Sequence, residues 1–250
     1  MTQKKPFRSL LRRLWFTVIQ IPERFVIARH CPYGDPAFFD LAALPMTAAL
    51  EANWKAVRRE VEGVLQHSET VPNFQDIVEE ITVTDDDRWK TFFLYGFGHK
   101  VEANCARCPE TTRLIEQVPG MMTAFFSILY PHKHIPEHRG PYKGFLRYHL
   151  GLIVPEPQSG CRIRVGNEVA YWEEGRGLLF DDTKPHEAWN ETDGIRVVLF
   201  MDLIRPLPKV ASLVNQAIIR LMSRSPQVRR ARERQQQWAQ QDWAEAEPVW

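Results

Sequence analysis

The chain has 250 residues, of which 44% are hydrophobic, and this is enough for one large domain or two small ones with a proper core. A formal net charge of +1 argues against a dedicated nucleic-acid binder, and four cysteines are too few for a disulfide framework. No signal peptide is apparent, because the apolar run over residues 14–21 is interrupted by Gln20 and is too short to span a bilayer. We therefore expect a cytoplasmic protein without a nucleic-acid partner.

Basic residues gather in the first thirty positions, a segment with Glu23 as its single acid. Over residues 7–21, apolar side chains recur at helical spacing, with Arg8, Arg12 and Arg13 elsewhere around the turn. This pattern predicts a basic amphipathic helix. It either packs on its own domain or lets residues 1–25 contact an anionic membrane at the inner, cytoplasmic face.

Helical patterns come first along the rest of the chain. Leu50, Trp54, Val57, Val61 and Val64 form the apolar stripe of a helix that begins near Pro45, and residues 109–118 form a shorter helix with Pro in its first turn. A strand is predicted over residues 89–96. Cys105 and Cys108 have a metal or redox spacing but no second pair, so we interpret them as structural.

Short strands then recur with Gly, Pro, Asn and Asp between them. We expect strands over residues 123–130, 145–154, 161–165, 169–172, 178–180, 186–189 and 195–203. This spacing predicts a mainly β fold with flanking helices, a double-stranded β-helix (jelly roll) behind an α-helical N-terminal layer. Residues 207–250 read as a helical tail rich in Arg and Gln, to which we assign no chemistry.

The chain is organised around residues 127–152, which run from one strand through a turn into the next. Along the second strand, Phe145, Arg147 and His149 share one face, because side chains alternate with period two. Leu146 and Leu150 point the other way. An Arg and a His on one face of an apolar strand are costly to bury unpaired, so we expect a polar ligand opposite them.

Histidines crowd into residues 132–138, and two interpretations compete. In the first, His132 and His134 are paired metal ligands on one strand face, as in cupin-type sites. In the second, His138 binds the metal together with His186 from a later strand. Two imidazoles with open positions suit ferrous iron in an oxygenase, for which a carboxylate ligand is usual. Gly140 cannot supply that carboxylate, whereas Asp181 and Asp182 are possible substitutes.

Arg196 lies in an otherwise apolar strand and needs a partner. One interpretation is an internal ion pair with an Asp or Glu, and the other is a bidentate pair with a ligand carboxylate. Ser127 could donate its hydroxyl to the same carboxylate.

With these residues in place, the chain resembles the aspartyl/asparaginyl β-hydroxylase family of iron(II)- and 2-oxoglutarate-dependent dioxygenases. The resemblance covers about residues 89–206 and rests on motifs in combination. These are HRGP at 138–141, LRYHLGL at 146–152, WEEG at 172–175, FDD at 180–182, HEAW at 186–189, and Arg196 ten residues after His186.

The resemblance implies a dioxygenase domain over residues 31–206, with Fe(II) as cofactor and with 2-oxoglutarate and O₂ as cosubstrates. It implies iron ligation by His138 and His186, with water in place of a third, carboxylate ligand. It implies contacts to 2-oxoglutarate from five residues: Trp89, Ser127, Arg147, His149 and Arg196.

Within the family, residues 138–152 and 202–206 look closer to the bacterial lipid A 2-hydroxylase branch and to related ornithine-lipid hydroxylases. That likeness implies hydroxylation next to the carbonyl of a lipid-linked acyl chain. One alternative is β-hydroxylation of Asp or Asn in a peptide or on a carrier, for which Arg164 could pair with the substrate carboxylate. Another is a non-catalytic, cupin-like metal-binding module.

Overall fold

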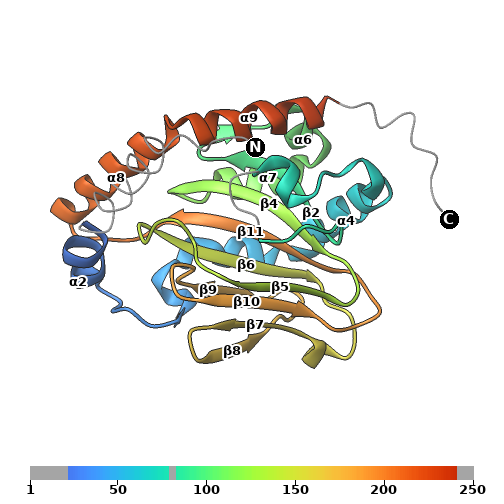
Figure 1. Ribbon diagram of the computed structural model, residues 1–250, viewed down its shortest axis with the longest axis horizontal. Helices are drawn as coiled ribbons and strands as arrows, with labels where there is room; N and C mark the ends of the chain where they lie inside the picture. Colours follow the sequence, from blue (N-terminus) through green and yellow to red (C-terminus); the bar gives the residue numbers. More distant parts are fainter. Residues whose placement is uncertain (1–21, 79–82, 241–250) are drawn as a thin grey trace, which may run out of the picture.

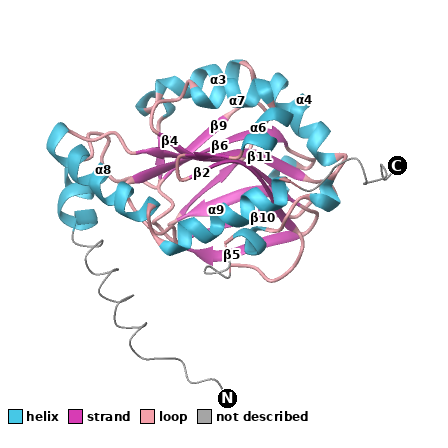
Figure 2. Ribbon diagram, turned by 90° about the horizontal axis from the view of Figure 1, so that it is seen from above, coloured by secondary structure: helices cyan, strands magenta, loops and turns pink. Residues whose placement is uncertain are grey.

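The computed structural model describes residues 22–78 and 83–240 (Figure 1). The predicted helix over residues 7–21 lies outside this part. The described chain forms two antiparallel sheets stacked on each other, with a helical layer on the outer face of the larger sheet (Figure 2). The prediction of a jelly roll behind a helical layer is therefore confirmed.

Most of the helices precede the main strands or follow them, and three short ones lie between strands. The helices before the main strands are η1 (Glu23–Ile27), α2 (Ala28–His30), η2 (Leu41–Ala43), η3 (Pro45–Thr47), α3 (Ala48–Ala52), α4 (Trp54–Leu65), η4 (Ser68–Thr70) and α5 (Phe74–Ile77). Those between strands are α6 (Glu102–Arg107), α7 (Pro109–Glu116) and η5 (Gln158–Gly160), and those after the strands are α8 (Lys209–Ser223) and α9 (Pro226–Ala239). The helix predicted to begin near Pro45 is thus interrupted at Asn53, and α6 was not predicted.

The larger sheet has seven strands within the described residues, in the order β1-β9-β6-β11-β4-β2-β3. Their bounds are β1 (Phe38–Phe39), β2 (Trp89–Gly96), β3 (His99–Lys100), β4 (Met121–Leu129), β6 (Phe145–Ile153), β9 (Gly177–Phe180) and β11 (Arg196–Ile204). The central strands β4, β6 and β11 are long apolar segments, and this suits strands that are covered on both faces.

The smaller sheet has four strands within the described residues, in the order β5-β10-β7-β8. They are β5 (Lys133–His138), β7 (Cys161–Val165), β8 (Glu168–Tyr171) and β10 (His186–Asn190). The sequence predicts a turn between the strands at residues 123–130 and 145–154, whereas the structure forms strand β5 within it, and this corrects the prediction. Pro136 does not prevent the strand because β5 lies at the edge of its sheet, where an N–H can be missing.

The larger sheet contributes to two cores, one on each of its faces. On one face, apolar side chains such as Leu146, Leu150 and Leu199 pack against α4 and α7. On the other face, Trp89, Leu129 and Val198 pack against the smaller sheet. Cys105 and Cys108 are buried in the helix-facing core, as expected for structural cysteines. The space between the two sheets is where the predicted site residues meet.

Candidate active site

His138 ends β5 and His186 begins β10, and the two residues are paired across the smaller sheet. The next pair in the register joins Ala188 to Ile135, so β5 contains one extra residue in a β-bulge. Strict alternation would turn Ile135 and His138 to opposite faces. The bulge instead brings His138 to the inner side with Ile135, and the two imidazole centroids lie 4.1 Å apart.

Backbone carbonyls orient both imidazoles. Nδ1 of His138 donates to the Pro136 carbonyl oxygen at 2.8 Å, and Nδ1 of His186 donates to that of Lys184 at 3.0 Å. Because a carbonyl can only accept, each Nδ1 carries the proton and each Nε2 keeps its lone pair. Burial lowers the pKa of both histidines, that of His186 to about 3, so both rings are neutral at pH 7. Two neighbouring neutral imidazoles, each with a lone pair on Nε2, suit a transition-metal ion.

Arg196, the first residue of β11, is 1% exposed and lies between the sheets. Its guanidinium stacks 4.5 Å from the Trp172 ring centroid, and Nη1 makes one long hydrogen bond of 3.4 Å to the Ser127 carbonyl. Nε has no partner, and Arg196 forms no ion pair with any carboxylate of the described chain. A buried cation without a counter-charge is costly, so the site fits an anionic ligand.

Ser127 and Trp89 lie beside this guanidinium on the neighbouring strands β4 and β2. The Trp89 indole Nε1 donates to the Ser127 hydroxyl oxygen at 3.0 Å, so the hydroxyl hydrogen remains available for another acceptor. Trp89 is held in place by stacking on Phe74, with ring centroids 4.1 Å apart. The pair can therefore present one hydroxyl donor to the ligand that Arg196 attracts.

His149 lies in the same layer, between the rings of Trp172, Phe180 and Phe200. Neither ring nitrogen has a hydrogen-bond partner, although the residue is buried. Burial, together with the nearby charges of Arg147 and Arg196, lowers the pKa of His149 well below its ordinary value. It is a neutral imidazole that can both donate to and accept from a ligand.

Arg147 differs from Arg196 because it already has acidic partners. Its Nη2 binds the Asp182 carboxylate at 2.8 Å, and its Nε binds Asp202 at 3.0 Å. Asp182 in turn fills the space beside Gly140, where any Cβ would overlap its carboxylate. Position 140 therefore has no room for the carboxylate ligand of an ordinary facial triad.

Over residues 22–78 and 83–240, no group of three or more His, Cys, Asp or Glu side chains is placed to hold a metal ion.

Several other candidates lie away from this site. His132 and His134 are exposed and bind Asp193 and Glu187, each at 2.9 Å, so the interpretation of these two as paired ligands is wrong. Arg164 lies on the outer side of the smaller sheet, where it pairs with Glu137 and Glu187. Asp181 is bound by Lys143 at 2.7 Å and by Arg205 at 2.8 Å, and this gives it a structural role.

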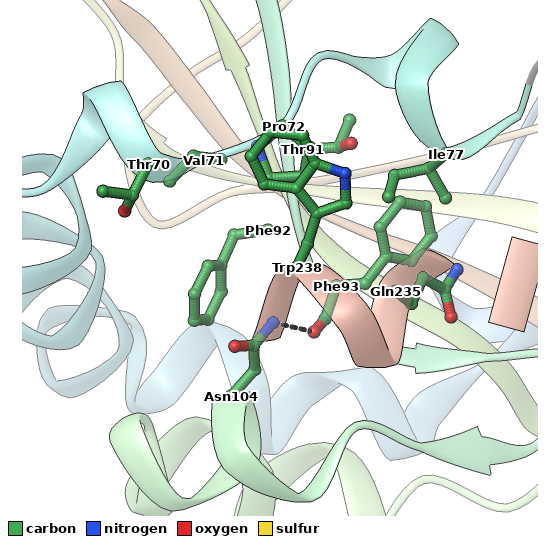
Figure 3. A pocket seen from close by; sticks show the side chains of 10 residues that line it. All are labelled: Thr70, Val71, Pro72, Ile77, Thr91, Phe92, Phe93, Asn104, Gln235 and Trp238. Atoms are coloured by element: carbon green, nitrogen blue, oxygen red, sulfur yellow. Dashed lines mark hydrogen bonds between the residues drawn. The ribbon is translucent and has the colours of Figure 1, made fainter. Parts of the chain in front are cut away.

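A separate small cavity lies between α9 and β2, under the Trp238 indole (Figure 3). Its volume is about 20 Å³, which fits a single water molecule and excludes a cosubstrate. The buried Thr91 hydroxyl, which has no protein partner, faces it. This cavity is therefore no alternative to the inter-sheet site.

Comparisons with known proteins assign the chain to a protein family. Residues 51–206 match the family model described as aspartyl/asparaginyl beta-hydroxylase. The chain belongs to this family. A Rhizobium tropici member, ornithine lipid ester-linked acyl 2-hydroxylase, is 44% identical over 96% of this chain and 85% of its own length. The human aspartyl/asparaginyl beta-hydroxylase is 33% identical over 64% of this chain, which spans only 21% of that protein.

Membership of this family makes the protein a hydroxylase enzyme. Among solved structures, the cupin domain of an XRE family transcriptional regulator from Enterobacter cloacae overlaps 48% of this chain and all of its own, with 15% identity and a TM-score of 0.34. The assignment of this β-hydroxylase family member to the jelly-roll folds therefore rests on its own strand order.

Sequence reasoning missed some contributors to the site. Trp172 supports Arg196, and Phe200 lies 4.2 Å from the Arg147 guanidinium, yet neither was named as a site residue. A signal for Phe200 was present in β11, where alternation places residues 196, 198, 200 and 202 on one face. For Trp172 the signal was the WEEG motif at 172–175, because alternation gives none for a residue that follows β8 in a loop.

Proposed function

We propose that the protein is an Fe(II)- and 2-oxoglutarate-dependent dioxygenase that hydroxylates carbon 2 of a lipid-linked acyl chain. His138 and His186 would hold the iron, and Arg196 with Ser127 would hold the distal carboxylate of 2-oxoglutarate. The observation that carries this proposal is the juxtaposition of two neutral imidazoles, both fixed through Nδ1, with a buried guanidinium that has no acidic partner.

Iron with bound 2-oxoglutarate and O₂ supplies the oxidising power that no amino-acid side chain has. The chain's own residues bind, orient and exclude water. The carbonyls of Pro136 and Lys184 fix the tautomers, so that both Nε2 atoms are ready to bind without losing a proton. The charge of Arg196 complements the carboxylate in the buried layer between the two sheets, where such a pair is strongest.

The remaining predicted contacts have different roles. His149 offers two unpaired nitrogens to the cosubstrate, and Trp89 orients the Ser127 hydroxyl toward it. Arg147 has two of its donor groups bound to Asp182 and Asp202. We therefore propose that Arg147 acts mainly by fixing the Asp182 carboxylate next to the loop that follows His138.

An acyl substrate is supported by two observations. The Rhizobium tropici relative, which matches along almost the whole chain, is named for 2-hydroxylation of an acyl group on ornithine lipid. The surroundings of His149 and Arg147 are aromatic, with Phe180 and Phe200 against them. Hydroxylation of aspartyl or asparaginyl residues is the second candidate, supported by the human relative. Arg164, our candidate partner for such a substrate, lies on the outer side of the smaller sheet.

The test is turnover with purified components. The chain, loaded anaerobically with Fe(II), is given 2-oxoglutarate, O₂ and ornithine lipid in detergent, with lipid A and an aspartyl peptide in parallel. We expect succinate to form with the lipid in equal amount to a product heavier by one oxygen, located by tandem mass spectrometry at carbon 2 of the acyl chain. Product formation from the peptide alone would contradict the lipid proposal, and no succinate with any substrate would contradict the proposed cosubstrate.

A further inference from the structure

Helix α8 has an outer face of apolar side chains that the described part of the protein leaves uncovered. Val210, Leu213 and Leu221 are 76%, 68% and 53% exposed. Together with Ala217 they follow helical periodicity and form one narrow stripe, which we call the α8 stripe. The opposite face of the helix, with Asn215, Ile219 and Met222, is buried. Large exposed apolar side chains in a row indicate an interaction surface.

The charge around the α8 stripe has one sign. Lys209 and Arg220 are exposed along one border of the stripe, and Arg224 follows the helix end. None of these three forms an ion pair with any described residue. From residue 209 to residue 239, covering α8 and α9, there are seven Lys or Arg residues and one acid, Glu233. An apolar stripe bordered by cations is the pattern of helices that lie in a membrane interface.

The buried face of α8 holds the loop that follows the candidate metal ligand His138. The Asn215 amide accepts a hydrogen bond from the Tyr142 hydroxyl at 2.9 Å and donates one to the Gly144 carbonyl at 2.9 Å. The Glu23 carboxylate in η1 accepts from the Lys143 amide of the same loop at 2.7 Å. α8 and η1 therefore lie at the end of the sandwich where His138 ends its strand.

The element η1 packs against α8 and carries an exposed apolar side chain of its own. Phe25 is 58% exposed, and Ile27 of the same segment packs with Ile219 and Met222 of α8 in one cluster. Figure 1 shows α2, which continues η1, beneath α8 at one end of the molecule. Exposed Arg29 adds a further positive charge there. η1 and α8 are thus neighbours at this end of the molecule, although they are far apart in the sequence.

We propose that the α8 stripe, with Phe25, docks on the surface of an anionic lipid bilayer and presents the His138 end of the sandwich to it. Charge complementarity favours this partner, because anionic lipid headgroups attract Lys and Arg while the bilayer interior accepts Leu and Val. A second copy of the chain would bring like charges together, which opposes self-association through this face. The proposal rests on the proposed function for its purpose, which is access to a lipid substrate.

The test is binding of the full chain to vesicles of phosphatidylglycerol and phosphatidylcholine, measured by sedimentation. We expect binding to these vesicles, and little to phosphatidylcholine alone. The double variant L213Q/L221Q should bind at least about tenfold more weakly, because two large apolar side chains no longer enter the lipid. The variant R220Q should lose about fivefold at low salt. As matched control, V169Q/Y171S changes two side chains of similar exposure on β8 and should bind like the original chain.

A label locates the contact. An environment-sensitive fluorophore on Leu213→Cys should report an aqueous surrounding in buffer and an apolar one after anionic vesicles are added. All four native cysteines are buried, so labelling is selective. A label that is already apolar in buffer means that residues 1–21 or a second copy cover the α8 stripe, and this would overturn the proposal. Vesicle binding that L213Q/L221Q leaves unchanged would also overturn it.

Turnover separates failure of this proposal from failure of the proposed function. With ornithine lipid embedded in anionic vesicles, L213Q/L221Q should lose most of its activity, whereas in detergent it should match the original chain. Equal activity of the two proteins on vesicles contradicts docking by α8 while the hydroxylase proposal stands. An original chain that binds vesicles but is inactive in both preparations contradicts the substrate and leaves the docking result in place.

Discussion

The two faces of strand β6 differ in the kind of polar group that they bury. On the helix-facing side, Leu146 and Leu150 belong to an apolar core, in which the one unpaired polar atom from β6 is the uncharged Tyr148 hydroxyl. On the side that faces the smaller sheet, His149 is buried with both ring nitrogens unpaired. On the neighbouring strand β11, Arg196 repeats this contrast with Val197 and Leu199, which lie on the helix side. One face of the sheet stabilises the fold by apolar packing, and the other has buried nitrogen atoms that remain able to bind a ligand.

The unpaired polar groups between the sheets lower the stability of the folded protein. A buried polar group without a hydrogen bond costs about 1–3 kcal/mol, and a charged group costs more. Unpaired atoms of His149, Trp172, Asp182 and Arg196 gather between the sheets. A bound anion and a metal would relieve part of this cost. We therefore expect ligands to stabilise the protein through this face alone.

The largest effect is expected from His186→Ala. It removes one of two imidazole ligands, and the remaining His138 cannot hold iron alone. Oxygen-dependent succinate formation should fall at least about 10³-fold, and Co(II) titration should show no d–d bands of the bound ion.

The matched control is His134→Ala, which removes an imidazole from the same small sheet. His134 stacks on Trp189 on the outer side and binds Glu187. Its activity should stay within about twofold, because exposed pairs contribute little. Equal losses in the two variants would refute the assignment of the metal to the inner side.

A smaller effect is expected from Arg196→Met, which keeps most of the side-chain volume and removes the charge. Loss of a charged hydrogen-bonding group costs about 1.5–3 kcal/mol, so the KM for 2-oxoglutarate should rise by about 10- to 150-fold while kcat changes less.

Arg162→Met is the control, because Arg162 also stacks on a Trp, 4.8 Å from the Trp189 ring centroid, but pairs with Glu191 on the surface. It should leave the KM unchanged. A kcat loss without a KM change in Arg196→Met would argue against cosubstrate binding by this residue.

Much of this site could be predicted from alternation and spacing. The period of two in residues 145–150 correctly separates Arg147 and His149 from Leu146 and Leu150, and the strand over residues 89–96 has the bounds of β2. Both results depend on local patterns that a regular strand preserves. The jelly roll follows from the number and spacing of the strands between turn residues.

Two features could not be predicted because they depend on contacts between distant segments. The bulge that turns His138 inward exists only in the pairing of β5 with β10, and the sequence of β5 by itself puts His134 and His138 on the same face. The acidic partners of Arg147 lie 35 and 55 residues further along the chain, at Asp182 and Asp202. The resemblance implies contacts to 2-oxoglutarate from both Arg147 and Arg196, whereas of these two only Arg196 has no acidic partner in the described chain.

Gly140→Ala tests how tightly the loop after His138 fits the site. Its new Cβ would overlap the Asp182 carboxylate, which is fixed by Arg147. The loop or the carboxylate must shift, at a cost of about 1–3 kcal/mol in free energy of unfolding, and iron affinity should fall with it. Urea unfolding and Fe(II) titration measure the two effects.

The control for this substitution is Gly63→Ala in α4, where an added Cβ meets nothing within 4 Å. Alanine in a helix stabilises by up to about 1 kcal/mol relative to glycine. Stability and iron affinity that remain unchanged in Gly140→Ala would mean that Asp182 does not constrain the loop.

The smallest predicted effect concerns pH and the metal-free protein. In the unfolded chain His149 has its ordinary pKa near 6.5, and in the folded chain burial lowers that pKa well below this value. The folded state therefore binds fewer protons, and the stability from neutral His149 is complete above pH 6.5 and is lost as the pH falls below it. Between pH 7.5 and 5.5 this loss is on the order of 1 kcal/mol for one histidine. Urea unfolding of His149→Gln should show a pH dependence smaller by that amount, because glutamine does not titrate.

His186 and His138, whose pKa values are also lowered, should keep the rest of the pH dependence of stability in the variant. The same slope in both proteins would mean that His149 keeps its ordinary pKa in the folded state, and the contrast between the two faces of β6 would then lose its energetic basis.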